Sequence, residues 1–251
     1  MFLFQTKDFK ILFATSEFIL KEIDNLITKN NYSASQVVTL NLLIYFQTKV
    51  DKTAYSALKN AKLVICDSFG VALVCSVFSF RFLRHQPGIE LIDKLCKERK
   101  YKIYLLGSTQ KVVEEAKNNL VLKYNANIVG SHHGYIFSSE ELLKEVLYDI
   151  EKKSPDILLV GLPTELQESW IWRNLNKLKC KVVIGVGGSF DVISGKLKRA
   201  PKVFRILGLE WFFRLVQQPW RFLRIIKLPL ALALLFFDCL SSKLKKYGKY
   251  K

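Results

Sequence analysis

The stretch VVIGVGGSFDVISGKLKRAPKVFRILGLEWFFRLVQQPWRFLR, Val182 to Arg224, joins a glycine-rich strand end to a tail rich in arginine and aromatic residues. Its first residues are apolar and β-branched and run into Gly185, Gly187 and Gly188, which predicts a buried strand that ends in a tight turn. The tail interleaves tryptophans with arginines, a combination that favours an anionic substrate held at a membrane. The arginines are Arg199, Arg205, Arg214, Arg221 and Arg224.

Upstream of this stretch, short runs rich in Val and Ile alternate with longer segments of helical period. This alternation is typical of a parallel sheet with crossover helices, so we expect an α/β fold: a Rossmann-like parallel sheet with flanking helices. Strands are expected at residues 36–41, 62–66, 102–107, 127–130, 157–161 and 182–187. Helices are expected near residues 50–59, 89–97, 111–120, 140–152 and 166–177.

Two pairs of residues have the spacing of a capping box, Ser138 with Glu141 and Thr164 with Gln167, and predict the starts of two helices. After residue 200 the strand pattern stops and the remaining sequence is typical of helices. We therefore expect a core over residues 1–200 and a C-terminal helical, membrane-associating appendage over residues 201–251.

The charge of the chain is concentrated in that appendage. The formal net charge is +17, and residues 196–251 hold 14 Lys or Arg against Glu210 and Asp238. The segment from Leu228 to Leu240, LPLALALLFFDCL, is too apolar for a nucleic-acid arm, and the chain shows no nucleic-acid module. It is also shorter than the roughly 20 apolar residues that span a bilayer. We expect it to lie on an anionic membrane surface and expect no nucleic-acid partner.

The start of the chain has no basic region and no cleavage pattern of a signal peptide, and the five cysteines form no closely spaced pair. These features favour a cytoplasmic protein with reduced, buried thiols, peripheral on the inner face of the cell membrane. The sequence leaves the oligomeric state open, a homo-oligomer included.

An open parallel sheet binds its ligand beyond the carboxyl ends of its strands. This rule places a set of polar and small residues along one rim of the expected sheet, at the carboxyl ends of its strands. Of these residues, Gly107, Ser108, Gly187, Gly188 and Asp191 are candidate substrate contacts. The full rim comprises Thr39, Asn41, Asp67, Gly107, Ser108, Gly130, His132, Gly161, Thr164, Gly187, Gly188 and Asp191.

Asp67 follows the apolar run LVIC and precedes Gly70, which permits a tight turn. A carboxylate at such a position can have a raised pKa and act as a general base, or it can simply cap the next helix. The loop GVGGSFD likewise fits either a phosphate-binding turn or a plain strand-to-helix connection. It is not GxGxxG, so the sequence does not predict a dinucleotide cofactor.

No metal site is predicted. His132 and His133 are adjacent, would point to opposite faces of a strand, and fit a structural or substrate-contact role better than ligation of one metal. The sequence has no Asp-x-Asp pair, the usual device by which sugar transferases hold a divalent cation against a diphosphate. If a diphosphate leaves at this site, arginines and backbone dipoles must take its charge. Arg214, Arg221 and Arg224 are spaced to share a helix face, which fits this role or an ordinary solvated face.

Over residues 39–224 the chain resembles the WecG/TagA/CpsF family of bacterial glycosyltransferases, glycosyltransferase family 26. The resemblance rests on T-x-N at Thr39, Asp67 with Gly70, PGIE at Pro87, YLLGS at Tyr104, IVGSHHGY at Ile128, Gln167-Glu168 with Trp170, VGGSFD, RAP at Arg199 and GLEWFFRL at Gly208.

The resemblance implies an inverting, metal-independent transferase without a cofactor. Such an enzyme moves a sugar, N-acetylmannosamine or a related hexose or uronic acid, from a UDP-sugar donor to a lipid-diphosphate-linked sugar acceptor during the synthesis of a cell-surface polysaccharide. By position it implies that Asp67 is the base, that Thr39 and Asn41 lie beside it, and that Gln167, Glu168 and Asp191 face the donor. Arg199, Arg214, Arg221 and Arg224 would meet the diphosphate, and His133 is a further candidate contact.

Three positions depart from the family pattern. Ser68 follows Asp67 where the family commonly has glycine, Thr164 to Leu166 lack a lysine that commonly precedes Gln-Glu, and His85 takes the place of an arginine, with Arg84 adjacent. An alternative of another class is therefore a non-catalytic partner subunit of a polysaccharide assembly complex.

Overall fold

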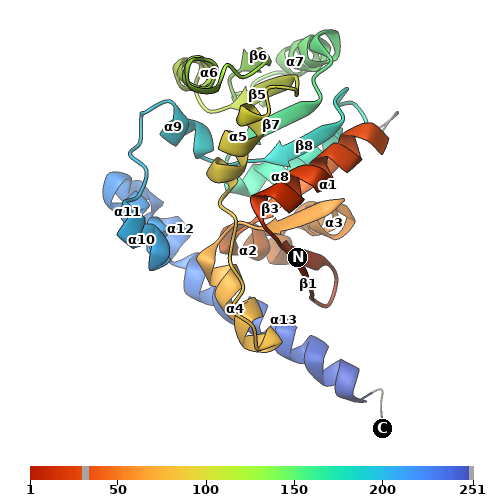
Figure 1. Ribbon diagram of the computed structural model, residues 1–251, viewed down its shortest axis with the longest axis vertical. Coiled ribbons are helices and arrows are strands. Elements are labelled where there is room, and N and C mark those ends of the chain that lie inside the picture. Colours follow the sequence, from red (N-terminus) through yellow and green to blue (C-terminus); the bar gives the residue numbers. More distant parts are fainter. Residues whose placement is uncertain (30–33, 249–251) are drawn as a thin grey trace.

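The computed structural model describes residues 1–29 and 34–248 and contains a twisted eight-stranded sheet flanked by helices (Figure 1). The strand order is β1-β2-β4-β3-β8-β7-β5-β6, and every pairing is parallel except that of β1 with β2. The predicted α/β fold is confirmed. The strands are β1 (Phe2–Gln5), β2 (Lys10–Phe13), β3 (Ser35–Leu40), β4 (Leu63–Cys66), β5 (Ile103–Gly107), β6 (Ile128–His132), β7 (Ile157–Gly161) and β8 (Val182–Gly185).

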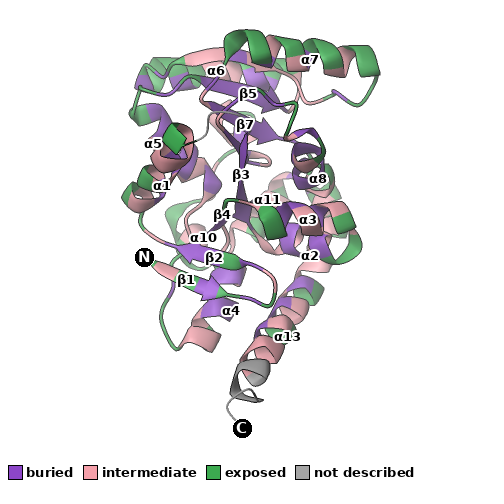
Figure 2. Ribbon diagram, turned by 90° about the vertical axis from the view of Figure 1, so that its right-hand side faces the viewer, coloured by how far each residue is buried: buried purple, intermediate pink, exposed green. Residues whose placement is uncertain are grey.

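Alternate residues of the central strands face opposite layers of helices, as the period of a strand requires. Val37 and Leu105 pack with α1 (Ser16–Lys29), α5 (Gly88–Lys97) and α6 (Gln110–Tyr124). Leu106 and Val160 pack with α7 (Glu140–Lys153) and α8 (Thr164–Asn174) on the other face. Figure 2 shows the strands buried between these layers and the outer face of α7 exposed.

Several elements were not predicted from the sequence. The chain begins with an antiparallel hairpin, β1 and β2, and β2 then pairs in parallel with β4. Helices α1, α2 (Leu42–Val50) and α4 (Phe69–Ser79) were also missed, and the helix expected at residues 50–59 is α3 (Lys52–Asn60). In α4, FGVALVCSVFS is apolar almost all round, so it has no amphipathic period to recognise.

Both predicted capping boxes are wrong by one residue. Ser139, not Ser138, caps α7 by accepting a hydrogen bond from the N–H of Leu142. Helix α8 begins at Thr164 itself, after Pro163, and no side chain caps it. The proline supplies the extended backbone that turns the chain into the helix.

The chain after residue 200 is helical, as expected, and comprises α10 (Lys202–Ile206), α11 (Glu210–Gln217), a 3-10 turn (Pro219–Arg221), α12 (Phe222–Ile225) and α13 (Lys227–Gly248). Helix α13 packs against α2 and α4 and buries Ala231, Leu235 and Cys239. The last residues of the expected appendage, 249–251, lie outside the described part of the chain.

Polar contacts add to this packing. Asp238 of α13 accepts hydrogen bonds from the hydroxyl of Tyr45 at 2.6 Å and from Lys49 at 2.5 Å.

Within residues 1–29 and 34–248, no helix has the length and hydropathy needed to cross a membrane. All five cysteines are free and buried, as the sequence predicted.

Candidate active site

The carboxyl ends of β3, β4, β7 and β8 open into a cavity of about 940 Å³, which α11, α12 and α13 close from the other side. The cavity brings together most of the rim predicted from the sequence. The predicted residues that line it are Thr39, Asn41, Asp67, Ser108, Gly161, Thr164, Gln167, Gly187, Gly188, Asp191, Arg199, Arg214, Arg221 and Arg224.

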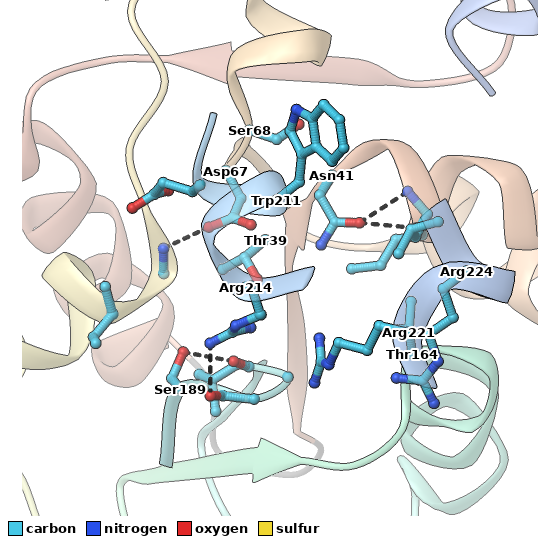
Figure 3. Close-up of a pocket in the computed structure, with 18 of the residues that line it drawn as sticks. Thr39, Asn41, Asp67, Ser68, Thr164, Ser189, Trp211, Arg214, Arg221 and Arg224 are labelled. Atoms are coloured by element: carbon cyan, nitrogen blue, oxygen red, sulfur yellow. Dashed lines mark hydrogen bonds between the residues drawn. The ribbon is translucent and has the colours of Figure 1, made fainter. Parts of the chain in front are cut away.

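Asp67 follows β4 directly, and its side chain turns into the cavity (Figure 3). Its Oδ1 accepts a 2.5 Å hydrogen bond from the backbone N–H of Gly88 at the start of α5. Burial raises the pKa of the Asp67 carboxyl to about 6, against hydrogen bonds from Gly88 and Asn41 that lower it, and the nearby Glu210 carboxylate raises it further. A carboxyl with this pKa is ionised at neutral pH and still basic enough to accept a proton.

Asp67 does not cap the helix that follows it. Ser68 takes that role, because its hydroxyl accepts a hydrogen bond from the N–H of Val71 in the first turn of α4. The serine that departs from the family pattern therefore has a local structural function, and the Asp67 carboxylate is left facing the cavity.

Thr39 and Asn41 flank Asp67 on the neighbouring strand end. The hydroxyl of Thr39 donates a 2.6 Å hydrogen bond to the carbonyl of Gly185 and so links β3 to β8. The Oδ1 atom of Asn41 caps α2 by accepting from the N–H groups of Leu43 and Ile44, both at 3.0 Å. These bonds fix the amide so that its other end meets Asp67.

Three arginines from the C-terminal helices also line the cavity (Figure 3). Arg214 donates to the carbonyl of Gly188 at 3.2 Å, and Arg224 forms an ion pair with Glu165 at 3.2 Å. The pKa of Arg221 is lowered to about 10, first by burial and then by the charges of Arg214 and Arg224. Positive charge thus accumulates here beyond what nearby carboxylates neutralise, which favours the binding of an anion.

Arg199 has a different partner from the one expected. Its guanidinium pairs with Glu90 of α5 at 2.5 Å, and Arg205 pairs with the same carboxylate at 3.3 Å. The two ion pairs fasten the start of the C-terminal helices to the core. Arg199 lines the cavity, but Glu90 already compensates its charge.

Buried side chains of α8 hold the glycine loop that follows β8. Gln167 accepts a 2.8 Å hydrogen bond from the N–H of Gly187, and it donates to Glu168 at 2.7 Å. Glu168 also accepts from Gln36 at 2.8 Å. A Cβ atom at Gly185 would collide with the Gln167 and Glu168 side chains, so this approach requires glycine.

Three predicted contact residues do not line the cavity: Glu168, Gly107 and His133. Glu168 is 2% exposed and lies beneath Gln167, where burial raises its pKa. Gly107 packs its backbone against Gly161, and the ring of His133 turns back to accept the N–H of Tyr135 at 3.2 Å. These positions lie behind the cavity wall in this structure, and their role as substrate contacts stays a prediction.

Asp191 and Ser108 meet at the edge of the cavity. The hydroxyl of Ser108 donates to Asp191 at 3.3 Å, and Lys196 lies 3.3 Å from the same carboxylate. Ser108 has a φ of 55°, in the left-handed region that residues other than glycine adopt rarely. Backbone strain of this kind is common at ligand sites.

Glu210, His85 and Lys198 are ionisable residues that line the cavity but were not predicted from the sequence as substrate contacts. Glu210 opens α11 and is one of only two acidic residues after residue 195, a signal that could have identified it. His85 lines the cavity with a pKa lowered by burial, whereas Arg84 is exposed and lies outside it. Arg84, the neighbour of His85, therefore does not supply the missing arginine to the cavity.

Within the described ranges, no three His, Cys, Asp or Glu side chains are arranged to hold a metal ion. The charged groups that line the cavity include the carboxylates of Asp67 and Glu210 and the guanidinium groups of Arg214, Arg221 and Arg224.

Comparison with known proteins gives one consistent result. The family model described as the glycosyl transferase WecG/TagA/CpsF family matches residues 8–247. An N-acetylglucosaminyldiphosphoundecaprenol N-acetyl-beta-D-mannosaminyltransferase of Staphylococcus aureus strain MRSA252 is 33% identical over 197 residues, which are 77% of this chain and 76% of the relative. The proteins of the same name from strains MW2 and NCTC 8325 are 32% identical over the same shares.

Proposed function

The chain belongs to the WecG/TagA/CpsF family of glycosyltransferases, and from this membership we propose that it moves a sugar from a UDP-sugar to a sugar carried on a polyprenyl diphosphate. The names of the relatives specify N-acetylmannosamine as the transferred sugar and N-acetylglucosaminyl-diphosphoundecaprenol as the acceptor. We extend both to this chain as the first substrates to test, with related hexoses and uronic acids as further donors.

The observation that carries the proposal is the placement of Asp67 in one cavity with a cluster of three arginines, of which Arg224 is the member paired with a carboxylate. In the proposed step, the Asp67 carboxylate takes the proton of an acceptor hydroxyl as that oxygen attacks the anomeric carbon of the donor. The bond between that carbon and the diphosphate oxygen breaks, and UDP leaves with the electron pair. The attack from the side opposite UDP inverts the anomeric centre.

The arginine cluster supports a reaction without a metal ion. Arg214 and Arg221 offer guanidinium groups that can bind the donor's diphosphate bidentately and neutralise the charge that develops as UDP departs. Arg221 is held beside two like charges, those of Arg214 and Arg224. An anion placed there relieves this repulsion, so diphosphate binding and the arrangement of the arginines reinforce each other.

We also propose that the protein works at the inner face of the cell membrane. The C-terminal helices expose large apolar side chains beside basic ones, among them Trp211, Trp220, Leu223 and Ile226. Insertion of the apolar side chains and attraction of the basic ones to anionic lipids both favour binding of such a surface to a bilayer. Each basic group near the bilayer contributes about 1 kcal/mol to this binding.

The function is tested by measuring UDP release from the purified protein with N-acetylglucosaminyl-diphosphoundecaprenol in detergent. UDP-N-acetylmannosamine is tried first, then other UDP-sugars, with EDTA present throughout. Turnover that requires the acceptor and persists in EDTA is the expected result. Turnover abolished by EDTA would reject metal independence alone, and the absence of both turnover and UDP binding would reject the transferase.

The alternative of a non-catalytic subunit gains no support from the positions that suggested it. Ser68 caps α4 without displacing Asp67, and Thr164 lines the cavity at the first position of α8. We therefore retain the transferase as the proposed function.

A further inference from the structure

One end of the cavity is apolar. Six side chains from four helices form it, and we call this set the apolar lip: Leu42 of α2, Phe69 and Leu73 of α4, Trp211 of α11, and Leu228 and Leu232 of α13. Leu73 is 47% exposed and Trp211 43% exposed, although both sit at the mouth of a cavity. Apolar surface left open at such a place indicates an apolar ligand.

Glycines allow these helices to approach closely enough to form the lip. A Cβ atom on Gly70 would lie 2.6 Å from Leu42 Cδ1 and 3.8 Å from Leu232 Cδ1, so Gly70 sits between α2 and α13. A Cβ atom on Gly208 would collide with the ring of Phe69. The lip is therefore a packed wall that joins the core to the C-terminal helices.

The lip continues outward along α4 and α13, which lie side by side and lead away from the sheet (Figure 1). Val77 of α4, Phe80 at the end of that helix, and Phe236 and Phe237 of α13 are exposed along this path. Lys243 lies 4.3 Å over the ring of Phe80. An apolar route with basic groups beside it thus connects the cavity to the surface.

The lip also adjoins the arginine cluster. Leu228 lies in the first turn of α13, four residues after Arg224 of α12, and both residues line the cavity. The acceptor carries its own diphosphate, and with this group beside Arg224 the hydrocarbon chain attached to it begins at the lip. A nucleotide sugar has no apolar part to fill this space, whereas a polyprenyl diphosphate continues into a hydrocarbon chain.

We propose that the apolar lip binds the first isoprene units of the acceptor's polyprenyl chain, and that the chain leaves along α4 and α13 toward the bilayer. This inference rests on the proposed function for the identity of the acceptor. It adds a role for α4, a helix of the core, in recognition of the lipid.

The first test is chemical cross-linking with an isoprenoid diphosphate that carries a photoreactive group on its hydrocarbon chain. The full-length protein in detergent micelles is irradiated with this probe, and the labelled peptides are identified by mass spectrometry. Labels within residues 69–77 and 225–237, displaced by excess unlabelled polyprenyl diphosphate, are expected. Labels confined to other segments would overturn the inference.

The second test compares two acceptors that differ only in their chain. Leu73→Ser removes one exposed contact of the lip, and Leu122→Ser on α6, where Leu122 is 84% exposed, is the matched control. The measured quantity is the KM for N-acetylglucosaminyl-diphosphoundecaprenol divided by the KM for an analogue with a short alkyl chain. Leu73→Ser should raise this ratio about tenfold, since one buried large apolar contact is worth about that much in affinity.

The outcomes separate the inference from the function. If wild type turns over both acceptors but the ratio in Leu73→Ser equals that in Leu122→Ser, the lip is rejected and the transferase stands. If no sugar is transferred from any donor while the probe still labels α4 and α13 competitively, the transferase fails and isoprenoid binding at the lip stands.

Discussion

The backbone N–H of Gly88 donates a 2.5 Å hydrogen bond to Oδ1 of Asp67 and joins the first turn of α5 to the end of β4. The bond orients the carboxylate toward the cavity and lowers its pKa, while burial raises that pKa by a larger amount. Asp67 therefore combines a fixed orientation with a basicity suited to proton transfer near neutral pH.

Asp67→Asn should lower kcat by about 10²- to 10⁴-fold, because a positioned general base contributes about that factor. The amide keeps an oxygen for the Gly88 N–H, so the fold should persist. UDP release measures the effect, with the exposed Glu114→Gln on α6 as the control. Turnover of Asp67→Asn at the wild-type rate would remove Asp67 from the mechanism.

The pH profile should report the pKa of Asp67. Since its carboxyl has a pKa raised to about 6, kcat/KM should fall about tenfold per pH unit below about pH 6 and level off above it. The measurement is the initial rate of UDP release from pH 4.5 to 8. A profile that stays flat through pH 6 would contradict the assignment.

Asp67→Asn should also stabilise the protein at high pH. The folded pKa of about 6 exceeds the ordinary aspartate pKa of 3.8, so the folded state binds more protons between these values and stability falls as pH rises through that window. Above about pH 6, the substitution removes the free-energy cost of keeping a charged carboxylate buried, which is on the order of 3 kcal/mol. Thermal unfolding at pH 8 and pH 4 should show a higher Tm for the variant at pH 8 alone.

Arg221→Ala should lower kcat/KM by about 10- to 100-fold, which corresponds to the loss of a charge-assisted hydrogen bond to the diphosphate. Added pyrophosphate should raise the Tm of wild type more than that of the variant, since a ligand stabilises the state that binds it. Arg173→Ala on the exposed side of α8 is the control. Equal Tm shifts in all three proteins would place the diphosphate elsewhere.

Glu90→Gln should loosen the start of the C-terminal helices, because Arg199 and Arg205 both pair with this carboxylate. These groups are partly exposed, so the loss of global stability should not exceed about 1 kcal/mol. Limited trypsin digestion should nevertheless cleave faster after Arg199 and Arg205. The exposed Glu151→Gln on α7 provides the comparison, and identical cleavage rates would argue against this anchoring role.

Glu168→Ala should act on stability before it acts on substrate binding. It leaves the amides of Gln167 and Gln36 without their buried acceptor, a loss of about 2 to 4 kcal/mol in the free energy of unfolding. Urea denaturation measures the loss against the exposed Glu145→Ala. A raised donor KM with unchanged stability would instead show that Glu168 contacts the donor.

The sequence by itself determined the parallel sheet and its functional edge. The local composition of runs such as Ile157–Gly161 indicates buried strands. Parallel strands bring Thr39, Asp67 and Gly187 to one edge of the sheet, however the helices pack. The family followed from motifs along the same strand ends, and the match over residues 8–247 confirms it.

Tertiary structure alone decided which side chains at that edge face the cavity. Whether Asp67 or Ser68 caps α4 depends on side-chain orientation, and whether Arg199 meets a ligand or Glu90 depends on a contact across 109 residues. Likewise α4 carries no amphipathic signal, since its second apolar face is covered by α13 from the far end of the chain. Local patterns encode periodicity, whereas charge pairing and the covering of apolar faces are set by packing between distant segments.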